Sequence, residues 1–199
     1  MTEEKILEAA TRVFRAKGCE GARMQEIADE AGINKAMLHY YFRSKEFLFE
    51  RVFRDTTRQF FSELNSVLRS DHSLNEKIRL LCRLYIDMSM ENPFMPLFII
   101  SELNRHPDAF IRSMFRNAGV KPDYTLFRKQ IDAEVKAGRI YPVHPMIVIQ
   151  NILGMCIFPV ITFPMMMHMS GMDEMACRNV MEERRKLVPE MIIRSLQKK

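Results

Sequence analysis

Apolar residues recur at helical spacing through the first part of the chain. From Thr2 to Lys17 they follow the i, i+3, i+4 pattern, which predicts a helix with one apolar face: Ile6, Leu7, Ala10, Val13 and Phe14. A shorter segment from Met24 to Ala31 has the same pattern, at Met24, Ile27, Ala28 and Ala31. Gly18 and Gly32 end these two helices, because glycine tolerates the positive φ of a sharp turn.

The residues after Gly32 predict a third, short helix. Asn34 is a strong N-cap for it, and Leu38 and Phe42 are placed to anchor it to a core. The outer face is then left to five residues: Lys35, Ala36, Met37, His39 and Tyr40. A short helix, a tight turn and a second short helix form a helix-turn-helix, whose second helix has the size to enter a DNA major groove.

The rest of the chain is predicted to be helical as well. Ser44 caps a long helix over 45–69, and further helices are expected at 74–91, 94–105, 108–118, 123–138, 145–167 and 173–197. Prolines and glycine mark the breaks, and Pro159, Pro164 and Pro189 are expected to kink or split the last two helices. No segment alternates with the period of a strand, so the fold class is all-α.

Composition places the chain among ordinary globular proteins and adds one detail about charge. Of 199 residues, 47% are hydrophobic and 28% charged, and the net charge is +5. Residues 1–50 contain eight Lys/Arg and nine Asp/Glu, so the basic excess lies elsewhere. The local pattern matters more, since Lys35, Arg43 and Lys45 occur with no acid between them.

Several function classes receive no support from the sequence. The apolar stretch over 145–169 is interrupted by Gln150, Asn151 and prolines, so a kinked helix in a core or an interface is expected and no membrane span. The four cysteines are scattered without a CxxC pair, which predicts reduced thiols in a cytoplasmic protein. The histidines lack metal-ligand spacing, and no nucleophile-elbow, Walker or dinucleotide glycine motif occurs. We therefore expect no enzyme, no metal and no cofactor.

The N-terminal residues together resemble the TetR family of transcriptional regulators. The matching set covers about the first 50 residues: Ile6-Leu7, Ala10, Phe14, Gly18, Ile27-Ala28, Ala31-Gly32-Ile33, Leu38, Tyr41-Phe42, Ser44-Lys45-Glu46 and Leu48. The resemblance implies a homodimer with a DNA-binding domain over 1–48 and a helical ligand-binding and dimerisation domain over 49–199. It also implies that the last two long helices, 145–167 and 173–197, build the dimer interface. The resemblance further implies a repressor that is released from DNA when a ligand binds.

Two positions depart from the family pattern. Arg23 stands where many members carry Thr or Ser, which cap the second helix and touch phosphate. Arg23 can still reach a phosphate, but it cannot cap in the same way. His39 stands where members usually have Tyr. These departures leave the contact at each position open and do not affect the expected fold.

The candidate DNA contacts divide into two sets. Cationic and hydroxyl groups suit backbone phosphates: Arg23, Lys35, His39, Tyr40, Tyr41 and Lys45. Ala36 and Met37 suit base edges, with Lys35 as a third candidate. The alternative is an ordinary solvated helix face, with Tyr41 half-buried against the following helix.

The second domain is rich in methionine and aromatic residues, which suit an adaptable apolar cavity. The candidate ligand-binding residues are Tyr85, Phe98, Tyr124, Phe127, Asn151, Met155 and Phe158. Packing in the core or the dimer seam is the alternative for each of them.

The sequence therefore predicts a homodimeric regulator that binds a palindromic double-stranded DNA operator and responds to a small hydrophobic or amphipathic ligand. A repressor is the expected form. The alternatives are an activator, or a helical ligand-binding or scaffolding protein without operator binding.

Overall fold

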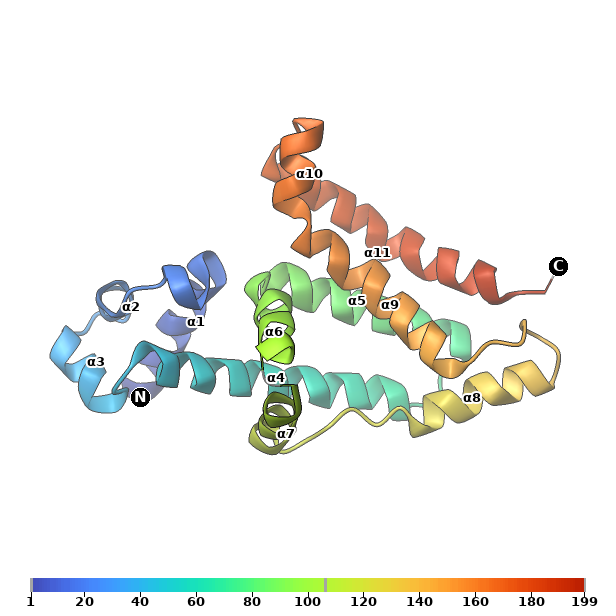
Figure 1. The fold of residues 1–199 in the computed structure, drawn as a ribbon, viewed down its shortest axis with the longest axis horizontal. Helices are drawn as coiled ribbons and strands as arrows, with labels where there is room; N and C mark the ends of the chain where they lie inside the picture. Colours follow the sequence, from blue (N-terminus) through green and yellow to red (C-terminus); the bar gives the residue numbers. More distant parts are fainter. Residues whose placement is uncertain (1, 106, 199) are drawn as a thin grey trace. The chain divides into compact units, whose positions relative to one another are not determined.

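The computed structural model describes residues 2–105 and 107–198, and this part of the chain consists of α-helices joined by loops, as predicted (Figure 1). Its elements are α1 (Thr2–Gly21), α2 (Met24–Glu30), α3 (Lys35–Tyr41), α4 (Lys45–Arg69), α5 (Leu74–Glu91), α6 (Phe94–Arg105), α7 (Pro107–Ala118), α8 (Thr125–Lys136), α9 (Pro145–Ile161), α10 (Phe163–Ser170) and α11 (Glu174–Leu196). The all-α fold class is confirmed.

The helices form two compact units. Unit 1 contains Met1–Phe60 and Leu97–Val120, and unit 2 contains Phe61–Pro96 and Lys121–Lys199. Two of the three boundaries fall inside α4 and α6, and the third lies between α7 and α8. Unit 1 therefore includes the expected DNA-binding domain together with 49–60 and 97–120. The functional division between residues 48 and 49 stays a prediction.

In unit 1, the apolar faces predicted for the first three helices form the core. Ile6, Ile27 and Leu38 have no exposed surface, and the Phe14 ring meets Phe49 edge-on at 5.1 Å between centroids. Helix α1 ends at Gly21, four residues after the predicted end at Lys17. The chain kinks at Gly18, which has φ 67° and ψ 178°, and then makes another helical turn to Gly21. The positive φ expected at Gly18 is confirmed, but the prediction that the helix ends there is wrong, because helical hydrogen bonding resumes after the kink.

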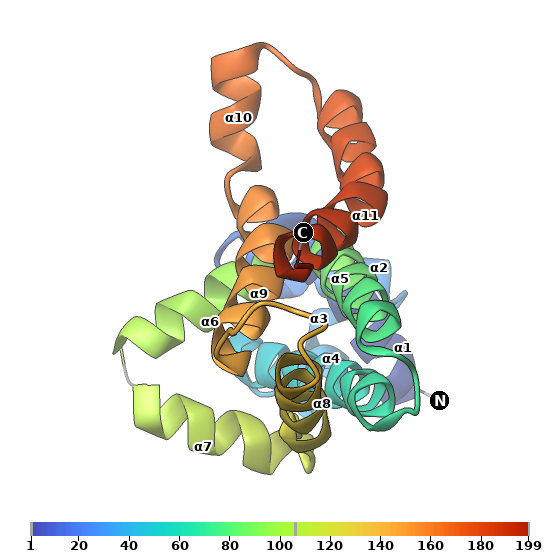
Figure 2. The same ribbon diagram turned by 90° about the vertical axis from the view of Figure 1, so that its right-hand side faces the viewer.

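In unit 2, α5, α9 and α11 pack side by side, as Figures 1 and 2 show. Their facing surfaces are apolar and buried at Leu81 and Cys82 of α5, Ile152 and Cys156 of α9, and Ile192 of α11. At the edges of this packing, Arg79 contacts Glu190 at 2.7 Å and Arg185 contacts Asp87 at 2.6 Å. Burial of the apolar faces supplies most of the stabilisation, since exposed ion pairs contribute little.

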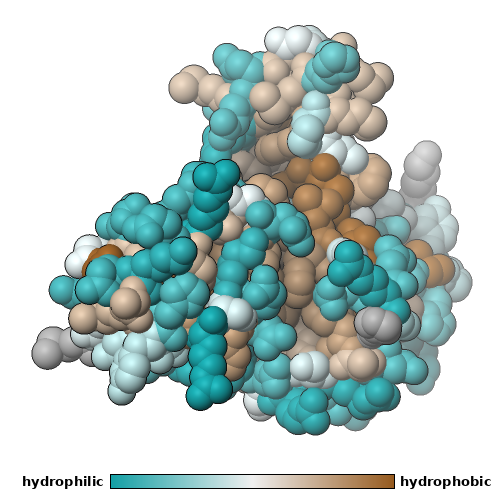
Figure 3. All heavy atoms as spheres, turned by 60° about the vertical axis from the view of Figure 1, so that its left-hand side comes forward, coloured by the Kyte–Doolittle hydropathy of each residue, from teal (hydrophilic) through white to brown (hydrophobic). Residues whose placement is uncertain are grey.

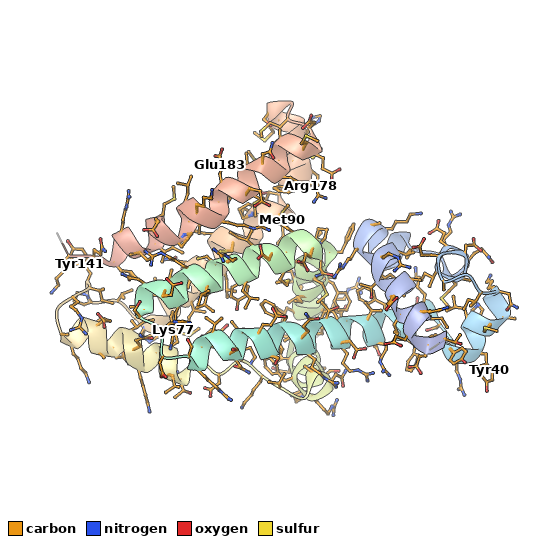
Figure 4. The ribbon with its side chains drawn as sticks, turned by 180° about the vertical axis from the view of Figure 1, so that it is seen from behind. Tyr40, Lys77, Met90, Tyr141, Arg178 and Glu183 are labelled. Atoms are coloured by element: carbon orange, nitrogen blue, oxygen red, sulfur yellow. The ribbon has the colours of Figure 1, made fainter. Side chains whose placement is uncertain are left out.

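A buried lysine joins the ends of α4 and α5. Lys77 is 3% exposed and its Nζ donates to the Leu68 carbonyl at 3.1 Å, near the last turn of α4 (Lys77 is labelled in Figure 4). Burial lowers the pKa of Lys77. The ammonium lies where the carbonyls of a helix end have no intrahelical partner, so this contact stops α4 without a glycine.

The helix predicted over 145–167 is interrupted. α9 ends at Ile161 and α10 begins at Phe163, with a bend of 60° between them. The Thr162 hydroxyl donates to the carbonyls of Phe158 and Pro159, both at 3.2 Å, and Pro164 lies in the first turn of α10. Within α9, Pro159 has no N–H to give the Met155 carbonyl, which accepts from Arg184 at 2.7 Å instead. This tertiary bond lets α9 continue past Pro159, so the break comes later.

Among the described residues, no single helix is long and apolar enough to cross a membrane; α9 and α10 reach that length and composition only when taken together, across their bend.

Candidate nucleic-acid interface

Local sequence signals position α3. Gly32 has φ 66°, so the chain reverses between α2 and α3 without backbone strain. The Asn34 side chain accepts a hydrogen bond from the Met37 N–H at 2.8 Å, and Ser44 Oγ accepts from the Phe47 N–H at 3.1 Å. Both predicted caps are confirmed. They fix where α3 starts and where α4 takes over.

The outer face of α3 is exposed to solvent. Tyr40 is 84% exposed, Met37 42% and Tyr41 40%, and Lys35, Ala36 and His39 are exposed as well. Figure 4 shows Tyr40 pointing away from the helices around it. The rings of Tyr40 and Tyr41 meet edge-on with centroids 5.5 Å apart. Six of the eight predicted DNA contacts therefore share one accessible surface, and we call these six residues the α3 face.

Carboxylates of unit 1 are paired away from the α3 face. Glu30 accepts from Arg12 at 2.6 Å and Glu26 accepts from Lys17 at 2.9 Å, so two of the three acids of α2 pair with α1. The third, Asp29, accepts from Gln25 of the same helix at 2.8 Å. No acid occurs from residue 31 to 45. Lys35 and Arg43 consequently have no directly adjacent acid in sequence, although residues 1–50 as a whole are almost neutral.

The two remaining candidate DNA contacts, Arg23 and Lys45, lie outside the α3 face. Arg23 is exposed and occupies the N-cap of α2, where its backbone N–H donates to Glu26 at 3.3 Å. Lys45 is half-buried, and its Nζ donates to the Glu20 carbonyl at 3.3 Å. Lys45 thus ties the start of α4 to the end of α1. Exposed Arg43, in the turn after α3, is a cation that the candidate set omitted.

The Glu26 contacts give a pH-dependent prediction. The hydrogen bond from Lys17 lowers the pKa of Glu26, and the Arg23 N–H adds to this. Wild-type protein therefore gains stability over Glu26→Gln above the ordinary glutamate pKa of about 4.3, and loses it as the pH falls through the lowered pKa. Urea unfolding should give a higher midpoint for wild type at pH 6 and converging midpoints at pH 3. Glu8→Gln, at an exposed position of α1, is the control, and a midpoint difference that persists at pH 3 would contradict the assignment.

Unit 1 also contains a cavity of about 260 Å³. Residues of α4, α6 and α7 line it: Glu50, Phe53, Arg54, Phe98, Glu102, Ala109, Phe110, Ser113, Met114 and Asn117. The Phe98 ring lies 4.9 Å from Phe53 and 5.9 Å from Phe110, between centroids. The site combines an aromatic wall with carboxylate and guanidinium groups, which suits a ligand with apolar and polar parts.

The structure distributes the predicted ligand-binding residues over both units. Phe98 lines this cavity, and the other six lie in unit 2. There, the hydroxyls of Tyr85 and Tyr124 are hydrogen-bonded at 2.9 Å, and Phe127 is fully buried. Asn151 and Phe158 are exposed on α9, with Met155 half-buried. The cavity residues of α4 and α7 were missed because their helical spacing is typical of core positions.

Comparison with known proteins matches residues 6–52 to the bacterial regulatory proteins of the tetR family. The chain is 34% identical over 91 residues to the HTH-type transcriptional regulator RutR of Escherichia coli K12, covering 46% of this chain and 42% of RutR. It is 22% identical over 152 residues to the nucleoid occlusion factor SlmA of Vibrio vulnificus YJ016, covering 76% of this chain and 78% of SlmA.

The fold is shared with a solved structure along almost its whole length. The transcriptional regulator FadR of Bacillus subtilis, in complex with stearoyl-CoA, superposes with a TM-score of 0.61 at 17% identity, covering 97% of this chain and 98% of that one. At this identity the likeness establishes the fold alone. The matched residues 6–52 contain the helix-turn-helix, and this segment belongs to the tetR family of bacterial regulatory proteins, whose members are DNA-binding transcriptional regulators.

Proposed function

We propose that the protein is a homodimeric repressor that binds a palindromic operator through α3 and leaves it when a small ligand binds. The observation that carries this proposal is the α3 face. Its apolar, hydroxyl and cationic groups are exposed together on a capped helix, and the preceding acids Glu26 and Glu30 are paired with cations of α1. An exposed aromatic cluster of this kind is unusual on a purely solvated helix.

The α3 face divides into roles by chemistry. Lys35 and Arg43 neutralise phosphates, and the hydroxyls of Tyr40 and Tyr41 donate to phosphate oxygens. Ala36 and Met37 face base edges, where a methyl or thioether group meets the thymine methyl. We assign Lys45 mainly to holding α4 against α1, because its amine is already bonded to the Glu20 carbonyl.

Dimerisation is proposed through α9 and α11. The outer side of α9 exposes Ile147, Asn151 and Phe158 at helical spacing, and α11 exposes Val180, Leu187 and Met191. Two copies of these faces form a four-helix bundle, related by a twofold axis like that of a palindrome. Gly154 lies on the same side of α9, and a Cβ built there meets no atom within 4 Å. A neighbouring helix can therefore approach closely.

The proposed effector site is the cavity of unit 1. Glu50, Phe53 and Arg54 come from α4, which begins four residues after α3 ends. A ligand that moves this part of α4 also biases the position of α3, and it releases DNA if it binds the non-operator conformation better. The mixed lining supports an amphipathic ligand. The stearoyl-CoA in the FadR structure is such a molecule bound to that protein.

Operator binding is tested by fluorescence anisotropy with DNA flanking the gene. We expect tight binding that weakens with salt, with a log–log slope of about −0.9 per phosphate neutralised. In Lys35→Ala/Tyr41→Phe, affinity falls by at least about tenfold, and the slope becomes shallower by about one for each lost phosphate contact. Lys129→Ala, which removes an exposed charge from α8, should leave both quantities unchanged.

The outcomes separate the alternatives. Equal loss of affinity in both variants would indicate a general charge effect and contradict a specific role for α3. Binding that survives in the double variant would point to a different DNA surface. If selection from random DNA also yields no preferred sequence, the helical scaffold becomes the better description. A reporter gene behind the operator distinguishes repression from activation.

A second candidate follows from the extent of the SlmA similarity, which reaches well beyond the helix-turn-helix. The protein would then bind DNA at many chromosomal sites without controlling one neighbouring gene. Mapping its binding sites across the genome decides between the two candidates, because a local repressor occupies one or a few promoters.

A further inference from the structure

Methionine is concentrated in α10 and the turn that follows it. Six of the 17 methionines of the chain lie between residues 165 and 175, a segment with no Leu, Ile or Val. Elsewhere the chain builds its core from those residues and Phe. Met181 is the one methionine among the buried hydrophobic residues of the described chain. Residues 165–175 therefore concentrate thioether groups, although a purely apolar surface could be built from Leu, Ile or Val.

These methionines do not serve the core of unit 2. Helix α10 buries none of its residues, and the exposed fractions are 53% for Met165, 73% for Met169 and 73% for Met175. Figure 3 shows pale brown side chains over the top of the molecule, where Figure 1 places α10. The sulfur atoms consequently remain available to a ligand from solvent.

Helical spacing brings an imidazole and two thioethers onto one side of α10. His168 and Met169 follow Met165 by three and four residues, so their Cβ atoms are neighbours, about 5–6 Å apart. The left-handed residue Gly171, with φ 67°, then reverses the chain, and the Met172 N–H donates to Ser170 Oγ at 3.3 Å. Met172 is thereby held next to the end of α10. Long, flexible methionine side chains from these positions can meet at one ion.

We infer that Met165, His168, Met169 and Met172 form a binding site for a soft monovalent cation, Cu(I) or the chemically similar Ag(I). Thioether sulfur is a soft ligand that selects Cu(I) over Mg²⁺, Ca²⁺ or Mn²⁺, which prefer oxygen. An imidazole nitrogen completes the donor set without adding negative charge. The inference is independent of operator binding and of the cavity in unit 1.

Competing metal sites are few in the described part of the chain. Residues 2–105 and 107–198 contain no group of three His, Cys, Asp or Glu side chains placed to hold a metal ion. Of the nearby acids, Asp173 accepts a hydrogen bond from the Ala176 N–H at 2.7 Å and caps α11. Cys82, Cys156 and Cys177 are buried, which leaves half-buried Cys19 as the thiol to remove before a test with a soft ion.

The test is a titration of full-length Cys19→Ser protein with silver nitrate, followed by NMR of ¹³C-labelled methionine methyl groups. We expect saturation near one ion per chain, with the largest shifts at Met165, Met169 and Met172. Met165→Leu/Met169→Leu keeps side-chain volume and should bind at least about tenfold more weakly. Met90→Leu/Met146→Leu removes two methionines outside the cluster, half-buried Met90 of α5 and exposed Met146 of α9, and should bind as tightly as the parent.

Circular dichroism of both double variants confirms that they are folded. The proposal is overturned if silver does not bind, if the cluster variant binds with unchanged affinity, or if the shifted methyl groups lie outside residues 165–175. Equal weakening in the two double variants would also overturn it, since a general effect of methionine loss would then explain the result. A parallel titration with Zn²⁺ should give no comparable methyl shifts, because thioether is a poor ligand for it.

Discussion

Replacing Leu38 by Ala is expected to abolish operator binding while unit 2 stays folded. Leu38 has no exposed surface and joins α3 to the core of unit 1. Removing a fully buried leucine side chain costs about 2–5 kcal/mol, through lost transfer free energy and the cavity that remains. Helix α3 has only seven residues, too few to persist in water without packing. The α3 face therefore loses its fixed geometry along with its anchor.

The measurement pairs urea unfolding, followed by circular dichroism, with operator binding by anisotropy. Met37→Ala is the matched control, since Met37 neighbours Leu38 in sequence but is 42% exposed. We expect the control to keep the unfolding midpoint and to weaken binding only on operators where Met37 meets a base. An unchanged operator affinity in Leu38→Ala would show that α3 is not the DNA-binding element.

Helix positions were predictable where local chemistry sets them. The predicted ranges 45–69, 74–91 and 94–105 coincide with α4, α5 and α6. Each begins or ends at a residue with a local reason, such as the Ser73 side chain, which accepts from the Glu76 N–H at 3.3 Å. The Asn34 cap and the Gly32 turn are local in the same sense. They depend on groups within four residues, which a sequence displays directly.

Features that depend on distant residues were not predictable. The course of α9 past Pro159 relies on Arg184, and the engagement of Lys45 relies on the Glu20 carbonyl. The cavity of unit 1 brings α4 together with the consecutive helices α6 and α7, and its lining residues Arg54 and Phe98 are 44 positions apart in the sequence. Residue type alone could not show that Phe98 lines this cavity while Phe127 packs in the core of unit 2. Both are aromatic residues on amphipathic helices.

The candidate DNA contacts include residues whose exposure follows from local sequence and one residue, Lys45, whose contact depends on a distant part of the chain. The exposure of Lys35, Met37 and Tyr40 follows from the period of α3, since these positions alternate with the buried anchor Leu38. The environment of Lys45 does not follow from helix periodicity, because its long side chain reaches back to the Glu20 carbonyl at the end of α1. Charge alone therefore did not distinguish Lys45, whose amine is bonded to the Glu20 carbonyl, from Arg43, which the structure leaves exposed after α3; the DNA contacts themselves stay predictions.

Replacing Phe158 by Asp is expected to dissociate the proposed dimer and, with it, to remove tight operator binding. Phe158 is 62% exposed in the single chain, so the charge is tolerated there and the protomer folds. In a twofold interface each substitution occurs twice, and each buries a carboxylate where an aromatic anchor stood. Loss of such an anchor costs at least about 2 kcal/mol, or roughly 30-fold in the dissociation constant.

Sedimentation equilibrium measures the dimer directly, and anisotropy measures its consequence. Leu126→Asp is the control, because Leu126 is a 46% exposed apolar residue on α8, a helix that contributes no residue to the proposed α9 and α11 faces. The control should remain dimeric and bind operator normally. A monomer retains one recognition helix and loses the second half-site, so operator affinity in Phe158→Asp should become dependent on protein concentration in the range where dimers re-form. If Phe158→Asp dimerises with the same constant as wild type, the interface lies elsewhere on the protomer. If the variant is a stable monomer that still binds the operator tightly, the two half-sites are not bound together by a dimer.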